Sequence, residues 1–161
     1  MATYRLQVLL EMRQRAEEDA KTAFAEAQKA LRLEEKKLQE EEELLERMIA
    51  DRKRRREEYS RKLASGEMKV TDQSSANRFL ERMKEKEAEQ KDRIEAQREQ
   101  VRRAEKEVKK AQDALIEATQ ELKALQKHKE NWETQIKKEM AAKEEDNLDE
   151  IGQVIFNQRR K

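Results

Sequence analysis

A seven-residue repeat of apolar positions runs through the second half of the chain and leaves few folds open to it. Every seventh residue falls into one of two interleaved rows, three places apart. The first row is Leu80, Glu87, Ile94, Val101, Val108, Leu115, Leu122, Lys129 and Ile136. The second row is Met83, Gln90, Gln97, Ala104, Ala111, Ala118, Leu125, Trp132 and Glu139. These rows correspond to the a and d positions of a heptad, and their length predicts a coiled-coil helix.

The first half repeats this pattern with more interruptions. One row spaced by seven is Leu10, Glu17, Phe24, Leu31, Leu38, Leu45, Arg52 and Tyr59. A second row, four places on, is Gln28, Glu35, Glu42, Ile49 and Leu63. A neighbouring stripe near the N-terminus is Leu6, Leu9, Ala16, Ala20, Ala23, Ala27 and Ala30. Together they predict a second long helix with a broad contact face, on which the alanines allow close helix packing.

The composition favours long helices over a globular domain. The chain has no proline and two glycines, Gly66 and Gly152, and good helix formers fill most other positions. Charged residues make up 47% of the chain, hydrophobic residues 35% and aromatic residues 4%. This apolar content is too small for a rounded core, so the apolar side chains must form a thin seam.

A turn is expected within residues 64–72. Gly66 can adopt the left-handed conformation that ends a helix, and Thr71 with the aspartate after it offers an N-cap and an early acidic residue. A short connection makes two long helices antiparallel neighbours. Folding the chain at residue 69 or 70 pairs apolar residues of the two halves. These pairs are Leu45 with Ile94, Leu38 with Val101, Leu31 with Val108 and Phe24 with Leu115.

We therefore predict an all-α fold: a long two-helix antiparallel coiled-coil hairpin with a short C-terminal helical extension. Residues 1–161 form a single domain. Its parts are helix 1 at about 3–64, a turn at about 65–71, helix 2 at about 72–145 and the extension at about 147–158. The extension is predicted because Asn147 and Glu150 form a capping pair at which helix 2 would break.

The C-terminal segment is expected to extend beyond helix 1. The same fold axis places Tyr4 opposite Gln135, so the chain after about Met140 lacks a partner within the molecule. Its apolar residues at an otherwise polar terminus are Ile151, Val154, Ile155 and Phe156. Two interpretations remain open: a frayed or folded-back tail, and a segment that docks on another protein.

The sequence offers no catalytic, cofactor-binding or metal-binding constellation, and we expect a protein that is not an enzyme. His128 is the single histidine and lies between two lysines, which predicts a surface residue. The two glycines are too far apart for a phosphate-binding loop, and no cysteine is present. The many carboxylates are expected on a solvated face with ion pairs along the helix, because a two-helix fold offers no dry pocket.

The charges favour protein partners over nucleic acid. Lys and Arg number 38 and Asp and Glu 37, so no strong positive field is expected. The basic run Arg52–Arg56 points all round a helix, and solvent or an acidic protein partner suits it better than a nucleic-acid groove. Arg52 also occupies a seam position, where a charge helps to specify register. No apolar stretch approaches the ~20 residues of a membrane span and no secretory signal is apparent, so we expect a cytoplasmic protein without membrane insertion.

The layout and three short strings resemble the YscO/FliJ family, the central stalk proteins of type III secretion and flagellar export. The strings are Tyr4-Arg5-Leu6-Gln7-Val8-Leu9, His128-Lys129-Glu130-Asn131-Trp132 and Asp149-Glu150-Ile151-Gly152-Gln153. The resemblance implies a monomeric stalk in the pore of the hexameric secretion ATPase, which promotes ATPase assembly or activity. It also implies contacts with the export gate and substrate chaperones, and peripheral association with the membrane-embedded apparatus.

We also predict protein-binding residues, four of which the resemblance implies. Those of a gate-facing tip near the turn are Tyr59, Leu63, Phe79 and Met83, while both termini would face the ATPase. The other candidates are Arg52, Arg55, Trp132, Ile151, Val154 and Phe156. Two alternatives stay open: a passive structural or scaffolding coiled coil, which forms dimers or higher oligomers, and a polyanion-binding protein that uses Arg52–Arg56.

Overall fold

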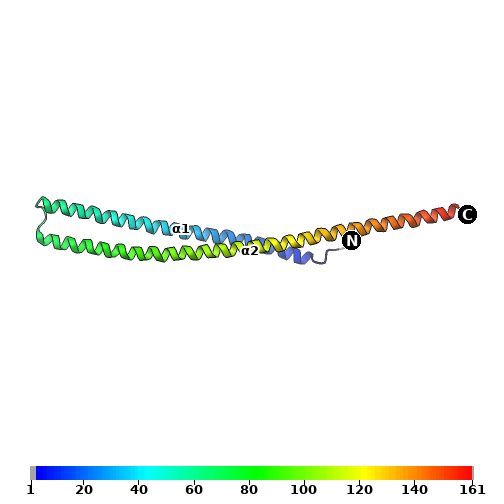
Figure 1. Ribbon diagram of the computed structural model, residues 1–161, viewed down its shortest axis with the longest axis horizontal. Helices are drawn as coiled ribbons and strands as arrows, with labels where there is room; N and C mark the ends of the chain where they lie inside the picture. The colour runs from blue at the N-terminus through cyan, green and yellow to red at the C-terminus, as the bar shows by residue number, and fades with distance from the viewer. Residues whose placement is uncertain (1–2, 161) are drawn as a thin grey trace. The chain divides into compact units, whose positions relative to one another are not determined.

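The protein consists of two antiparallel helices joined by a short turn, in a computed structural model that describes residues 3–160 (Figure 1). Helix α1 is Gln7–Ala64 and helix α2 is Val70–Arg159. The predicted all-α helical hairpin is confirmed. The chain divides into two compact units. The turn unit is Ala23–Gln112, and the terminal unit combines Met1–Thr22 with Asp113–Lys161.

The turn unit begins its reversal at Gly66, as the sequence predicts. Gly66 has φ of +79°, the left-handed region in which a side chain would be strained. Its N–H donates to the carbonyl of Leu63 at 3.3 Å, and the N–H of Met68 donates to the carbonyl of Lys62 at 3.2 Å. These bonds satisfy carbonyl groups that the end of α1 would otherwise leave without a partner.

Helix α2 begins slightly earlier than expected, at Val70. Thr71 therefore lies inside the first turn and is not the N-cap that we predicted. The aspartate after it caps the helix, because the backbone N–H of Lys69 donates to Oδ2 of Asp72 at 3.2 Å. In a capping box the side chain of the third helical residue accepts a hydrogen bond from the N-cap N–H, and this bond is of that kind. The negative charge of Asp72 also interacts favourably with the positive end of the helix dipole.

The two predicted rows of α2 form its contact face. Every member from Leu80 to Ile136 is buried or half-buried, whereas Glu139 is exposed. The buried members include Ile94, Val101 and Leu122, and also the polar residues Glu87 and Gln90. The heptad read from the sequence is therefore correct along this helix, including its polar positions.

On α1 one predicted row is correct and the other is displaced. The residues from Leu10 to Tyr59, spaced by seven, are all buried or half-buried. In the row four places on, Glu42 and Ile49 are half-buried, but Gln28, Glu35 and Leu63 are exposed. The second seam row instead lies three places on and is half-buried throughout: Arg13, Ala20, Ala27, Glu34, Glu41, Met48 and Arg55. Ala20 and Ala27 belong to the neighbouring stripe that we predict from the sequence, whereas the pattern misses the other five members because four of them are charged.

The C-terminal part of α2 is one continuous helix. It passes through Asn147 and ends at Arg159, so the predicted break at Asn147 and the separate extension are absent. Asn and Gly weaken a helix interior by only about 0.5–1 kcal/mol each, which the surrounding helix formers outweigh. All residues from 137 to 160 are exposed.

Candidate functional site

A buried ion pair crosses the seam of the turn unit. Nε of Arg52 donates to Oε1 and Oε2 of Glu87 at 3.0 and 2.7 Å, and the two side chains are only 17% and 7% exposed. Arg52 is one of our predicted protein-binding residues. In the hairpin it contacts Glu87, and a charged pair at a seam position favours one register of α1 against α2.

Two glutamines of α2, one heptad apart, make the same cross-helix contacts. Nε2 of Gln90 donates to the backbone carbonyl of Glu41 at 3.0 Å, and Nε2 of Gln97 donates to that of Glu34 at 3.0 Å. Each amide also donates to the carboxylate of the same glutamate. Buried polar groups are tolerated when they are fully hydrogen-bonded, and no buried side-chain nitrogen or oxygen in the described residues lacks a partner. The repeated contact therefore favours one alignment of the helices.

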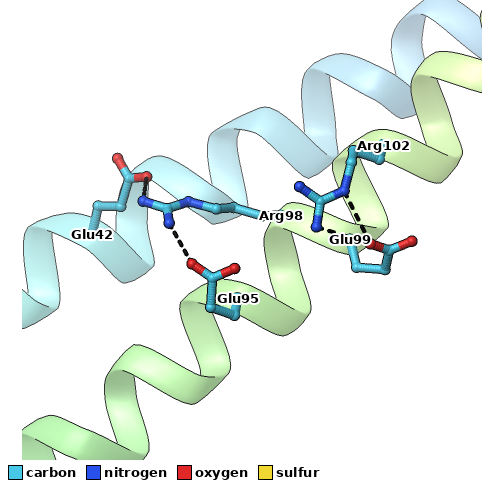
Figure 2. Close-up of polar contacts among 5 residues, drawn as sticks. All are labelled: Glu42, Glu95, Arg98, Glu99 and Arg102. Carbon is cyan, nitrogen blue, oxygen red and sulfur yellow. Dashed lines mark hydrogen bonds and ion pairs between the residues drawn. The ribbon is translucent and has the colours of Figure 1, made fainter.

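The flank of the same unit carries exposed ion pairs (Figure 2). Arg98 of α2 lies 3.5 Å from a carboxylate oxygen of Glu42 of α1 and also pairs with Glu95 on its own helix. Arg102 pairs with Glu99 at 2.9 Å. The hydrogen bond from Arg102, helped by its charge, lowers the pKa of Glu99 below 4.5. Such solvated pairs are weak because water and salt screen the charges, so they remain exchangeable.

Two of the four predicted tip residues line one shallow groove. Phe79 and Met83 lie beside Met48 in a groove of about 280 Å³. Two guanidinium groups flank the ring of Phe79, Arg55 at 5.1 Å and Arg82 at 5.8 Å from its centroid. Cation–π contacts of this kind hold an arginine over an aromatic face. The groove therefore combines an apolar floor with a charged rim that is mostly basic, where Arg82 and Lys86 lie beside one carboxylate, that of Asp51.

The other two tip residues line a different depression. Tyr59 and Leu63 face a cavity of about 130 Å³ whose lining also includes Met68, Ala76 and Leu80. Tyr59 is half-buried and Leu63 is exposed. The four predicted residues thus do not line a single pocket, although all belong to the turn unit.

The basic run Arg52–Arg56 is divided among several partners. Arg52 lies in the seam, whereas Arg54 and Arg55 both pair with Asp51, Arg55 at 3.4 Å. Arg56 lines a surface depression together with Lys53. This division agrees with our reading that the run does not form one face matched to a groove.

An aromatic cluster joins the N-terminal segment to α2 in the terminal unit. Tyr4 is buried, and its ring centroid lies 5.2 Å from that of Trp132 and 5.7 Å from that of His128. The Tyr4 hydroxyl is hydrogen-bonded to Nδ1 of His128, and Lys129 donates to Oε1 of Gln7 at 2.9 Å. His128 is exposed as predicted, but it also anchors Tyr4. Trp132, predicted to bind a partner, is half-buried and packs against Tyr4.

An apolar stripe lies on the C-terminal part of α2, with no partner. We call it the C-terminal stripe: Leu148, Ile151, Val154 and Ile155, which are 67%, 56%, 55% and 47% exposed. Phe156 is also exposed, beneath the guanidinium of Arg160 at 5.3 Å. Three of the predicted protein-binding residues, Ile151, Val154 and Phe156, are therefore exposed in this segment.

Neither a metal centre nor a membrane span is recognisable between residues 3 and 160. Their His, Asp and Glu side chains form no group of three or more suited to a metal ion. No helix in that range is both long and apolar enough to cross a bilayer.

The whole chain, residues 1–161, matches the model of the YscO-like protein family. It is similar to a solved structure described as a YscO homologue from Chlamydia trachomatis, with a TM-score of 0.85 and 24% sequence identity. That match covers 99% of this chain and 98% of the other, and it shows a shared fold. No curated protein matches. Since the family match spans both helices and the turn, it confirms the family resemblance, and the chain belongs to the YscO-like protein family.

Proposed function

We propose that this protein is a non-enzymatic central stalk component of a type III secretion export apparatus. It binds the pore of the hexameric secretion ATPase, promotes ATPase assembly or activity, and contacts the export gate and substrate chaperones. It works in the cytoplasm at the periphery of the membrane-embedded apparatus. Membership of the YscO-like family supports the role in secretion, and it is the observation that carries the proposal.

The two units supply different surfaces for these contacts. The exposed C-terminal stripe suits a stable contact, because isolated apolar side chains gain most from burial against a partner. The ion pairs around Arg98 suit brief contacts with successive ATPase subunits, because each is weak. The groove at Phe79, with its basic rim, suits an acidic surface of the gate protein.

The alternatives find less support. Polyanion binding by Arg52–Arg56 is disfavoured because Arg52 is half-buried and paired with Glu87, and its neighbours Arg54 and Arg55 pair with Asp51. A passive scaffold remains the outcome to test against, since a scaffold would leave ATP hydrolysis unchanged.

The decisive experiment measures ATP hydrolysis by the secretion ATPase of the same organism, with and without this protein. Stimulation is expected from the unmodified chain, together with co-sedimentation of the hexamer. Ile151→Asp with Val154→Asp should abolish the stimulation. Gln153→Asp is the matched control, because Gln153 lies outside the C-terminal stripe. Absence of both binding and stimulation by the unmodified chain would retire the proposal.

The gate contact needs a separate measurement. Phe79→Ala and Met83→Ala should weaken binding of the export-gate cytoplasmic domain, measured by calorimetry, while ATPase stimulation stays intact. Tyr59→Ala and Leu63→Ala report on the second depression. If all four variants bind the gate domain as tightly as the unmodified chain does, the gate-binding surface lies elsewhere on the protein.

A further inference from the structure

The C-terminal stripe has a geometry of its own, distinct from the hairpin seam. Leu148, Ile151 and Ile155 follow the i, i+3, i+7 spacing of one helix face. In the same segment the a and d rows of α2 continue as polar residues: Lys143, Asp146, Glu150, Gln153 and Asn157. A partner on the stripe therefore does not extend the coiled coil of the hairpin and needs a surface of its own.

Gly152 lies within this segment and has no structural reason to be glycine in the single chain. A Cβ added at Gly152 would meet no atom within 4 Å, and its backbone is ordinary helix. Glycine inside an exposed helix costs stability relative to alanine. One physical use for it is close approach of another backbone, which the absence of a side chain permits.

The charges on either side of the stripe are opposite in sign. Glu144, Glu145 and Asp146 precede it and Arg159 and Arg160 follow it, all of them exposed. When two such segments lie antiparallel, each acidic end faces a basic end. When they lie parallel, like charges face each other. These end charges are thus complementary to those of a second copy in the antiparallel direction and not in the parallel one.

We propose that the C-terminal segments of two copies pair antiparallel, with the two-fold axis near Gly152. Leu148 of one copy then packs against Ile155 of the other, and Glu144 and Glu145 face Arg159 and Arg160. The small contact makes the pairing reversible and dependent on concentration, so the monomer expected from the sequence is the dilute form.

This pairing covers the stripe that we assign to the ATPase, so self-association and ATPase binding exclude each other. Only this exclusion rests on the proposed function. The pairing itself is a property of the purified chain and is tested without any secretion protein.

Sedimentation equilibrium over a range of concentrations tests the pairing. The average mass should rise from one chain towards two, and high salt should reverse the rise by screening the end charges. Glu144→Lys with Glu145→Lys, and separately Arg159→Glu with Arg160→Glu, should each weaken self-association at least tenfold. An equimolar mixture of the two variants should associate again, because both ends are then complementary.

Cross-linking tests the position of the axis. The chain has no cysteine, so Gly152→Cys introduces a single thiol, which should form disulfide dimers rapidly upon oxidation. Gln153→Cys, off the stripe, is the control and should cross-link slowly. Circular dichroism checks that each variant stays helical. A chain that is monomeric at every concentration, or charge variants that fail to associate when mixed, would overturn the proposal. If the chain stays monomeric and the stripe variants lose ATPase binding, the occupant is the ATPase alone.

Discussion

Arg52 of α1 donates from Nε to both carboxylate oxygens of Glu87 of α2, at 3.0 and 2.7 Å, within the seam of the turn unit. Each residue lies one heptad nearer the turn than Leu45 and Ile94, the pair expected from the fold axis. The bond thus agrees with that alignment. An ion pair in this place contributes less to stability than to the choice of one register.

Removal of either Arg52 or Glu87 alone should therefore destabilise the protein, whereas replacement of both by apolar residues should not. Arg52→Ala leaves the carboxylate of Glu87 buried and unpaired, and should lower the free energy of unfolding by about 3 kcal/mol. The double variant Arg52→Leu with Glu87→Leu should have a free energy of unfolding equal to or greater than that of the unmodified protein. Urea unfolding followed by circular dichroism measures both. The exposed Arg54→Ala serves as a control that changes stability by less than about 0.5 kcal/mol. A double variant less stable than Arg52→Ala would contradict this account.

The cross-helix hydrogen bonds of Gln90 and Gln97 should favour one alignment of the two helices at some cost in stability. Gln90→Leu and Gln97→Leu place apolar side chains at seam positions and should each raise the free energy of unfolding by about 1 kcal/mol. The loss of four hydrogen bonds to Glu41 and Glu34 should also loosen the register. Spin labels at positions 36 and 103, on the exposed side of each helix, should then report a broader distance distribution. An unchanged distribution would show that the glutamines do not set the register.

The aromatic cluster should hold the N-terminal turns of α1 in place. Tyr4→Ala removes the ring contacts with Trp132 and His128, and should destabilise that segment by about 3 kcal/mol. Tyr4→Phe keeps the ring and loses only the hydrogen bond, which should cost about 1 kcal/mol. Because the chain has one tryptophan, its fluorescence reports directly on Trp132. Hydrogen exchange in residues 7–22 should accelerate in Tyr4→Ala, and equal exchange in all three proteins would refute the role.

Acid should weaken the exposed ion pairs of the turn unit. Arg102 holds the pKa of Glu99 below 4.5, so this pair stabilises the folded protein above that pH. Its contribution is lost as the pH falls through the lowered pKa of the folded state. Glu99→Gln should therefore reduce the slope of melting temperature against pH below 4.5, with little effect at pH 7. The difference should be small and should shrink in salt, because Glu99 is solvated. An unaltered slope would contradict a stabilising role of the Arg102–Glu99 pair.

Part of the candidate site was accessible to sequence reasoning and part was not. Ile151, Val154 and Phe156 were recognisable because apolar residues in a polar terminus stand out, and the structure leaves them exposed. Arg52 and Trp132 were assigned to partners, yet each contacts the opposite segment of its own chain. Composition cannot separate these cases, because an arginine or a tryptophan suits a seam as well as an interface.

The linear sequence determined the helices, the turn at Gly66 and the heptad face of α2, because each depends on residues close together along the chain. Only the tertiary structure decided which acidic side chains enter the seam. Glu34 and Glu41 lie there because Gln97 and Gln90 of α2 reach them, a contact between residues distant in sequence. Tyr4 likewise packs against His128 and Trp132, although the fold axis places it opposite Gln135, because side-chain packing sets the final alignment.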